Sequence, residues 1–199
     1  SGFDQNSLYS TITKESILVT RAKDLPFLIR RAFRVAVSGR PGAVHMRIPM
    51  DVYEEEAEVN DLYPDPCMAR WPYQRPIADP EQAAKAIELI AAAKRPVIVC
   101  GQGALVSDAG DEVTALAEML SIPVGCTMTA KGTISERHPL SIRLVGARGG
   151  TSHSNRFLST ADLVFFIGSN TDSAGTDGWK LPSSADGPKI ISLNIDGVD

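Results

Sequence analysis

The sequence has 199 residues with a formal net charge of −4, and it is 43% hydrophobic and 22% charged. These values are typical of a globular protein and allow one large domain, or one domain plus part of another. No apolar run reaches the ~18 residues of a membrane span, no basic stripe indicates a nucleic-acid partner, and the N-terminus lacks the pattern of a signal peptide. We therefore expect a cytoplasmic protein with neither a membrane nor a nucleic acid as its partner.

The first predicted elements are a helix and a strand. Residues 24–38 place apolar side chains at helical spacing, with Asp24 as the expected N-cap and Pro26 in the first turn. Residues 43–49 alternate apolar with polar side chains, which predicts a half-buried strand. Residues 1–53 look too small to own a core, so we expect them to be the end of another α/β domain.

A linker is predicted over residues 54–76. The stretch opens with acidic side chains and then carries four prolines, and neither the helical nor the strand period survives in it. We interpret the acidic run as a solvated face and not as a metal site.

Regular alternation of helices and strands begins after the linker. We predict, in chain order, a helix over 79–93, a strand over 96–100, a helix over 108–120, a strand over 122–126, a mostly irregular stretch over 132–150, a helix over 151–159, and strands over 162–168 and 189–195. Unbroken apolar strands that alternate with helices are typical of an open parallel α/β sheet with helices on both faces. Residues 77–199 are therefore predicted to form one such domain, truncated at its C-terminus.

The turn after the first of these strands raises the question of a nucleotide. Gly101 and Gly103 follow the apolar run 96–100, where open parallel sheets bind ligands and where a helix N-terminus favours an anion. The dinucleotide fingerprint needs a third glycine at position 106, which is valine here. A ligand-binding loop and a plain tight turn both remain open at this point.

Candidate catalytic residues are scarce. The three histidines, His45, His138 and His153, share no spacing, and the sequence contains no serine-hydrolase elbow, P-loop or zinc-protease motif. Lys131 lies in an expected ligand loop, where a solvated lysine is the alternative. We therefore predict no catalytic residue and no metal ligand within this chain.

The cysteines do not indicate a disulfide framework. Their number is odd and no two are separated by the spacing of a zinc or redox motif. Cys100 lies in an apolar run and Cys126 borders one, so we expect both to be buried free thiols, as suits a reducing compartment.

Several segments, taken together, resemble one family. They are RRAFRVAVSGRPGAVHMRIPMDV (30–52), AAKRPVIVCGQGA (92–104), IPVGCTMTAKGTISERHPL (122–140), ADLVFFIGS (161–169) and IISLNID (190–196). In order and spacing they are similar to thiamine-diphosphate-dependent enzymes of the acetolactate synthase type. The resemblance implies that residues 1–53 end a pyrimidine-binding domain and that residues 77–199 form most of the Rossmann-like central domain.

The resemblance also implies a reaction and its cofactors. Such an enzyme is a transferase or lyase that decarboxylates a 2-oxo acid with thiamine diphosphate and Mg²⁺, and it works as a homodimer or homotetramer. The glutamate that activates the cofactor would lie before Ser1, and the Mg²⁺-binding G-D-G…N motif would lie beyond Asp199. We therefore expect this chain by itself to be inactive.

The central domain of acetolactate synthases holds FAD, which the resemblance carries over to specific positions. The contacts would fall on Gly101, Gly103, Thr127, Lys131, Gly146, Gly149, Gly168, Ser169 and Asp196. The sequence departs from the family at residues 168–173, where an arginine and an aromatic side chain are missing. FAD, an ADP-like ligand and no ligand at all therefore remain alternatives for this domain.

Overall fold

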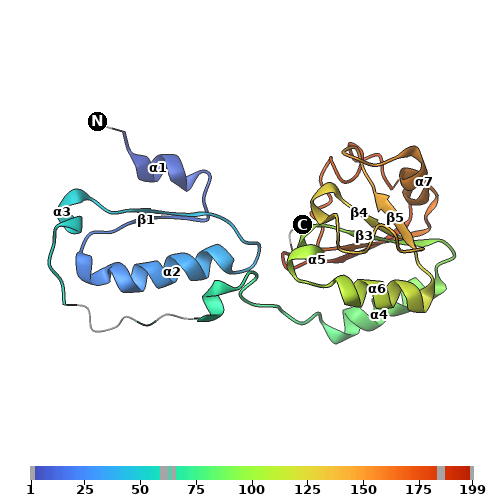
Figure 1. The fold of residues 1–199 in the computed structure, drawn as a ribbon, viewed down its shortest axis with the longest axis horizontal. Helices are drawn as coiled ribbons and strands as arrows, with labels where there is room; N and C mark the ends of the chain where they lie inside the picture. The colour runs from blue at the N-terminus through green and yellow to red at the C-terminus, as the bar shows by residue number, and fades with distance from the viewer. Residues whose placement is uncertain (1–2, 59–62, 64–65, 183–186, 198–199) are drawn as a thin grey trace. The chain divides into compact units, whose positions relative to one another are not determined.

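The computed structural model describes residues 3–58, 63, 66–182 and 187–197. The chain divides into two compact units, Ser1–Arg75 and Pro76–Asp199 (Figure 1).

The first unit is built on a short parallel β–α–β arrangement. Strand β1 (Glu15–Leu18) pairs in parallel with β2 (Val44–Arg47), and helix α2 (Leu25–Val37) connects them. The unit also contains α1 (Gln5–Ser10), α3 (Met50–Tyr53) and 3₁₀ turns at Ala22–Asp24 and Pro66–Ala69. The predicted helix and the predicted strand are confirmed as α2 and β2.

Three elements of the first unit, α1, β1 and α3, were not expected from the sequence. They have six, four and four residues, so none is long enough to establish a clear period. The 3₁₀ turn at Pro66–Ala69 lies within the stretch predicted as a linker, and the rest of its path over 59–62 and 64–65 lies outside the described residues.

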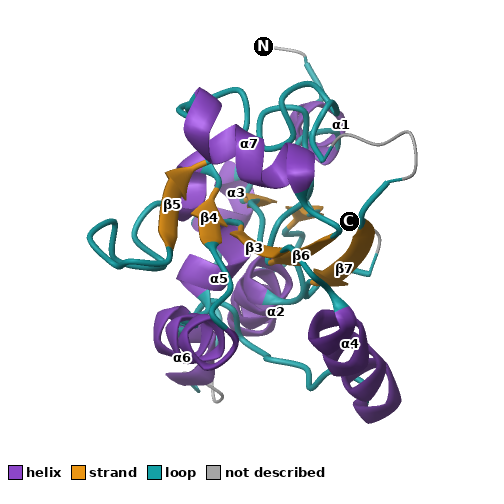
Figure 2. Cartoon of the chain, turned by 90° about the vertical axis from the view of Figure 1, so that its right-hand side faces the viewer, coloured by secondary structure: helices purple, strands orange, loops and turns teal. Residues whose placement is uncertain are grey.

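The second unit contains a five-stranded parallel sheet with the strand order β5-β4-β3-β6-β7. Helix α7 lies on one face of this sheet, and α4, α5 and α6 lie on the other (Figure 2). The expected fold class, an open parallel α/β sheet with helices on both faces, is confirmed. The elements in chain order are α4 (Pro80–Ala92), β3 (Pro96–Cys100), α5 (Gln102–Val106), α6 (Gly110–Leu120), β4 (Val124–Cys126), a 3₁₀ turn (Met128–Ala130), β5 (Ser141–Leu144), α7 (Ser152–Thr160), β6 (Leu163–Ile167) and β7 (Lys189–Leu193).

Alternating residues of the central strands feed two separate cores. On β3, Val97 and Val99 pack with Leu158 of α7, while Ile98 and Cys100 pack with residues of α4, α5 and α6. This is the period of two that a strand imposes, with both faces apolar because both are covered. The continuous apolar runs of β3 and β6 thus follow from burial on both sides.

Helix α4 begins where the sequence predicted. The carboxylate of Asp79 accepts hydrogen bonds from the backbone N–H groups of Glu81 at 2.8 Å and Gln82 at 3.2 Å, and Pro80 occupies the first helical position. These contacts satisfy donors that a helix N-terminus otherwise leaves unpaired.

Four expectations for this unit need correction. The stretch 132–150 contains strand β5, which was missed because it has four residues and turns Arg143 into a left-handed conformation (φ +65°) where its register to β4 shifts. Residues 102–106 form helix α5 and not a loop, since five residues are too few to show a helical period. The predicted helix over 108–120 places Val113, Leu116, Ala117 and Leu120 on one apolar face, but Leu120, the last residue of α6, is exposed. The last apolar run, β7, is an exposed edge strand and is not buried on both faces.

Candidate functional site

The residues singled out from the sequence gather at one edge of the sheet. Because all five strands of the second unit are parallel, their carboxyl ends lie together, and each is followed by a candidate loop. The positions after the strands are Gly101 after β3, Thr127 after β4, Gly146 after β5, Gly168 and Ser169 after β6, and Asp196 after β7.

The two loops at the centre of this edge are in direct backbone contact. A Cβ atom added to Gly101 would lie 2.3 Å from the carbonyl oxygen of Gly168 and 2.4 Å from the Cα of Ser169. A Cβ at Gly168, whose φ is +61°, would lie 2.3 Å from the backbone nitrogen of Ala104. The missing side chains are therefore replaced by neighbouring backbone, and the turn is glycine-rich because two chain segments cross there.

The backbone N–H groups that could bind a phosphate already donate hydrogen bonds to acceptors within the protein. Gly101 donates to the carbonyl of Ile167 at 2.8 Å, and Gly103 donates to the carbonyl of Gly168 at 2.9 Å. After β4, β6 and β5, respectively, the N–H of Thr127 donates to the carbonyl of Cys100 at 2.9 Å, that of Gly168 to the carbonyl of Leu193 at 2.8 Å, and that of Gly146 to the Oδ1 of Asn155 at 2.9 Å. A phosphate at these positions would have to compete with each of these hydrogen bonds.

The loop after β6 covers much of the remaining edge. Within it, Asp172 accepts from the backbone N–H of Gly175 at 2.8 Å, and its own carbonyl accepts from the hydroxyl of Thr176 at 2.7 Å. A Cβ on Gly146 would meet the carbonyl of Ala174 at 2.3 Å, and a Cβ on Gly175 would lie 3.1 Å from the Cγ2 of Thr127. The loop thus brings Gly146 and Thr127 together and occupies the space beside them.

Ser169 is buried and is held from two sides. Its Oγ accepts from the backbone N–H of Thr171 at 3.2 Å, and its carbonyl accepts from the Nδ2 of Asn194 at 3.0 Å. Asp196 is half-buried shortly after β7. The Ser169 hydroxyl and the Asn194 side-chain amide therefore hold this side of the edge through hydrogen bonds to backbone. They do so next to the segment 168–173, where an arginine and an aromatic side chain were expected from the resemblance.

Two candidate positions lie apart from this centre. Lys131 is exposed and pairs with Glu136 at 3.3 Å. Gly149 has a φ of +92°, and a Cβ there would lie 2.8 Å from the Cδ1 of Leu144. The structure therefore gives Lys131 a solvated ion pair and Gly149 a packing role.

The histidines do not assemble into a catalytic group. His138 accepts from the backbone N–H of Leu140 on Nδ1 at 3.2 Å and faces Glu118 through Nε2 at 3.1 Å. His153 packs edge-on against Phe157, and His45 stacks on Tyr9 in the other unit. Among the described residues no group of three or more His, Cys, Asp or Glu side chains could hold a metal ion.

The fit to a flavin nucleotide is poor at the glycines. Each glycine named for it has protein atoms where a ligand would need open space, and five of the candidate amides already have carbonyl or carboxamide partners. We therefore derive no step through a flavin. The arrangement can hold the strand ends together through these hydrogen bonds.

Three polar residues that organise this edge were missed in the sequence: Asn155, Asp172 and Asn194. Each accepts or donates across a turn or from a neighbouring strand end. Asx residues beside glycines are the signal that could have identified them, because their short side chains pair with nearby backbone.

The strand order and parallel pairing define a doubly wound, Rossmann-like α/β domain. The pattern that describes the family "Thiamine pyrophosphate enzyme, central domain" matches residues 83–199. The chain therefore belongs to the thiamine pyrophosphate enzyme family.

Curated relatives agree with that assignment over both units. A probable acetolactate synthase large subunit of Methanococcus aeolicus is 40% identical over 98% of this chain and 32% of its own length. An acetolactate synthase large subunit of Corynebacterium glutamicum is 35% identical over 98% of this chain and 30% of its own length. A glyoxylate carboligase of Escherichia coli O157:H7 is 32% identical over 97% and 32% respectively. The chain spans about a third of the length of these relatives.

None of the helices in the described part of the chain has the length and apolar character needed to cross a membrane.

Proposed function

We propose that this chain is part of a thiamine-diphosphate-dependent enzyme that decarboxylates a 2-oxo acid and transfers the product to an acceptor, as acetolactate synthases do. The observation that carries the proposal is the similarity to acetolactate synthases across both units, at 35–40% identity over 98% of the chain. Residues 1–53 would end the pyrimidine-binding domain, and residues 77–199 would form the central domain.

Within such an enzyme this chain's residues would act as a scaffold. Bound thiamine diphosphate with Mg²⁺ supplies the carbanion chemistry, and the protein orients it. The described residues include no candidate metal cluster, so they would contribute rigid support through the parallel sheet and its strand-end contacts.

The reaction class is tested on the full-length protein. Pyruvate consumption should require both thiamine diphosphate and Mg²⁺, and sedimentation should show a homodimer or homotetramer. Turnover that is indifferent to thiamine diphosphate would contradict the proposal.

The scaffold role is tested on residues 1–199 alone. We expect no decarboxylation of pyruvate and no thiamine diphosphate binding in the micromolar range by titration calorimetry. Either activity in this chain would place catalytic residues within it and overturn the scaffold role.

A second candidate function is a nucleotide-binding central domain that holds FAD or an ADP-like ligand. A purely structural domain is favoured instead, because the backbone N–H groups of the glycines already donate to acceptors within the protein. The site residues named for FAD stay a prediction, and an absorbance scan of the purified full-length protein between the ultraviolet and the visible tests it. Flavin bands that survive gel filtration would favour the nucleotide-binding function.

A further inference from the structure

Two thiols face each other inside the second unit, away from any role proposed above. Cys100 is the last residue of β3 and Cys126 the last residue of β4, and the two are register partners in the parallel sheet. Their exposed fractions are 0% and 4%. Both belong to the core on the α5 and α6 side, where Ala130 and Ile134 of the following segment also pack.

The two thiols are not equivalent. The neighbouring Cys126 thiol raises the pKa of Cys100, and burial raises that pKa further. The neighbouring Cys100 thiol lowers the pKa of Cys126; burial and the charge of Glu136 oppose this, and the backbone N–H of Ile134 lowers that pKa further. We therefore expect Cys126 to ionise before Cys100.

The backbone already has the spacing that a disulfide needs. Neighbouring strands lie about 4.8 Å apart, and disulfides join Cα atoms roughly 4.4–6.8 Å apart. Because paired residues of parallel strands direct their side chains to the same face, both sulfurs lie on one side of the sheet. Side-chain rotation can bring the sulfurs together without separating the strands.

We propose that Cys100 and Cys126 form a buried dithiol that a small hydroperoxide oxidises to a disulfide joining β3 to β4. The Cys126 thiolate attacks the peroxide oxygen, the O–O bond breaks, and the alcohol leaves after protonation. Cys100 then attacks the resulting sulfenic sulfur and loses its proton to the departing hydroxide, which leaves as water. Two thiols lose two electrons and two protons, and the hydroperoxide is reduced to an alcohol and water.

Access to the pair depends on the segment that follows β4. Ala130 and Ile134 of this segment belong to the same buried cluster as the thiols, and the backbone N–H of Ile134 acts on Cys126. We expect a local opening of the segment to admit the oxidant without unfolding the sheet. The disulfide would then tie together the ends of the two strands that carry the Gly101 and Thr127 loops.

The test uses the 199-residue chain carrying Cys67→Ser, since Cys67 is exposed and would otherwise react. The chain is treated with tert-butyl hydroperoxide, unfolded in denaturant and alkylated. We expect both remaining thiols to resist alkylation until a reductant is added, the intact mass to fall by two hydrogens, and the peptides with Cys100 and Cys126 to be joined. The unfolding midpoint should rise by about 5 °C or more, since a long loop is closed.

Matched variants separate the two sulfurs. With Cys100→Ser added, dimedone should label Cys126 as a sulfenic acid; with Cys126→Ser added, Cys100 should remain open to alkylation. The proposal is overturned if both thiols are still alkylated after a treatment that oxidises Cys67 of the unsubstituted chain. It is equally overturned if Cys126 is oxidised to sulfinic acid with Cys100 left free. If a variant does not fold, peptide mapping of the oxidised, unsubstituted chain shows whether the peptides with Cys100 and Cys126 are joined.

Discussion

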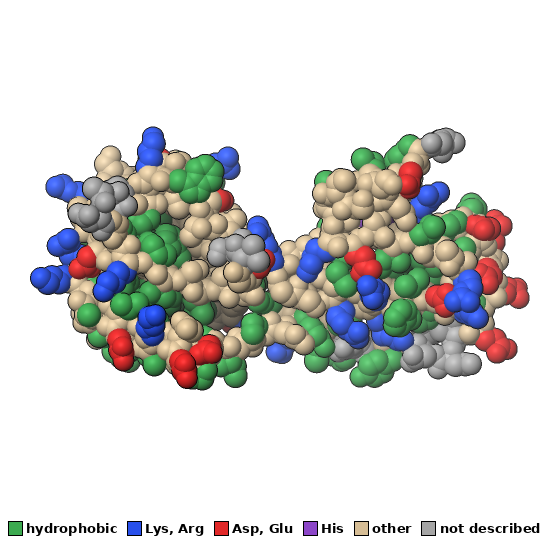
Figure 3. All heavy atoms as spheres, turned by 180° about the vertical axis from the view of Figure 1, so that it is seen from behind, with side chains coloured by type: hydrophobic (Ala, Val, Ile, Leu, Met, Phe, Trp, Pro, Cys, Tyr) green, Lys and Arg blue, Asp and Glu red, His purple; other side chains and the backbone are tan. Residues whose placement is uncertain are grey.

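The two units use similar elements but differ in how much they bury. In the second unit, fourteen buried residues form the core on one face of the sheet and eight form the core on the other. In the first, the described buried cluster has three residues, Val19, Ala22 and Val52. Helix α2 has a clear apolar stripe, yet Phe27 and Phe33 are 59% and 57% exposed, and apolar side chains lie among charged ones on its surface (Figure 3). A helical pattern thus predicts the helix itself, while burial depends on what packs against it.

The largest difference is expected from alanine at two left-handed glycines. Gly168 has a φ of +61° and Gly39 a φ of +54°, but only at Gly168 would a Cβ meet backbone, at 2.3 Å. The conformational cost of about 1 kcal/mol applies to both, and the clash with backbone at Gly168 should bring its loss to about 4 kcal/mol or more. Denaturant unfolding monitored by hydrogen exchange measures both losses. Exchange of β3 and β6 reports on Gly168→Ala, and exchange of α2 reports on Gly39→Ala.

Equal losses at the two glycines would show that the contact at Gly168 can relax. Gly197→Ala provides a control, because a Cβ there meets nothing within 4 Å.

A slightly smaller difference is expected from large-to-small changes in the two units. Leu158 of α7 has an exposed fraction of 0% and packs against the sheet. Leu158→Ala should therefore lower the free energy of unfolding by about 3 kcal/mol, because it leaves a cavity. Phe33→Ala removes a larger but mostly exposed side chain and should change it by no more than about 0.5 kcal/mol. Chemical denaturation of both variants checks the pair, and a larger loss for Phe33 would show that α2 is covered in solution.

A pH-dependent difference is expected at two carboxylates. Burial raises the pKa of Asp162, but the backbone N–H groups of Arg95 and Lys94, each 2.8 Å from its oxygens, outweigh burial and lower that pKa overall. A folded-state pKa below the unfolded one gives stability that is present above the unfolded pKa of about 3.9 and is lost as the pH falls through the folded value. Asp162→Asn should therefore cost about 1 kcal/mol near neutral pH and progressively less below pH ~4.

In the first unit, hydrogen bonds from Ser7 lower the pKa of Asp4, but they are local to α1 and exposed. Asp4→Asn should accordingly shift the unfolding midpoint less than Asp162→Asn. Thermal unfolding from pH 3 to pH 7 compares the two, and a loss for Asp162→Asn that is constant over this range would contradict the linkage.

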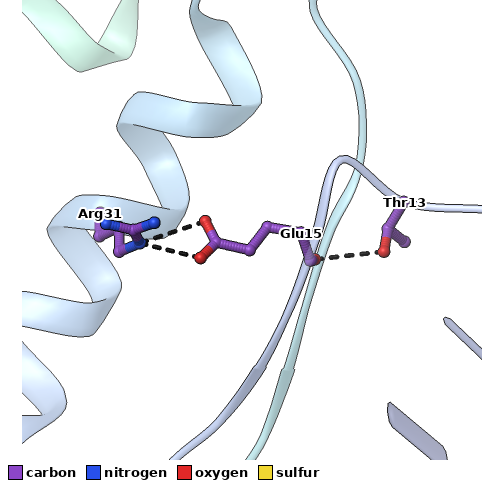
Figure 4. Close-up of polar contacts among 3 residues, drawn as sticks. All are labelled: Thr13, Glu15 and Arg31. Carbon is purple, nitrogen blue, oxygen red and sulfur yellow. Dashed lines mark hydrogen bonds and ion pairs between the residues drawn. The ribbon is translucent and has the colours of Figure 1, made fainter. Parts of the chain in front are cut away.

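The smallest effects are expected from surface ion pairs. Glu15 of β1 holds the Nε of Arg31 on α2 at 2.9 Å, and the carbonyl of Glu15 accepts from the hydroxyl of Thr13 at 3.2 Å (Figure 4). Because the pair is half-exposed, a double-mutant cycle with Glu15→Gln and Arg31→Gln should give a coupling of about 0.5 kcal/mol that fades in 1 M salt. The more exposed Lys131–Glu136 pair should give less, and a coupling that survives high salt at either pair would contradict this ranking.

The fold of the second unit could be predicted largely from sequence because β3 and β6 are unbroken apolar runs that alternate with helices. The start of α4 is indicated locally by Asp79 as the N-cap and by Pro80 at the first helical position. Strand β5 could not be predicted, since its partner β4 and not its own four residues supplies the pairing. The exposure of β7 was also hidden, because an apolar run does not reveal that a strand lies at the end of the sheet order.

The position of the candidate site could be predicted from the sequence, but the contacts of its residues could not. Parallel topology alone puts Gly101, Thr127, Gly146 and Gly168 at one edge. What the glycines contact depends on the approach of two loops that are distant in sequence, which no local pattern encodes. The hydrogen bonds that Gly101 and Gly103 donate to the carbonyls of Ile167 and Gly168 were therefore visible only in the structure.

The crossing of the Gly101 and Gly168 loops also limits how these positions can change together over evolution. Most tight contacts can be relieved by a second substitution that shrinks the neighbouring side chain. Here the atoms that a Cβ at Gly101 would meet are the carbonyl of Gly168 and the Cα of Ser169, which every amino acid possesses. No side-chain exchange at either partner can make room, so a compensating change would have to move a strand end and not merely resize a neighbour.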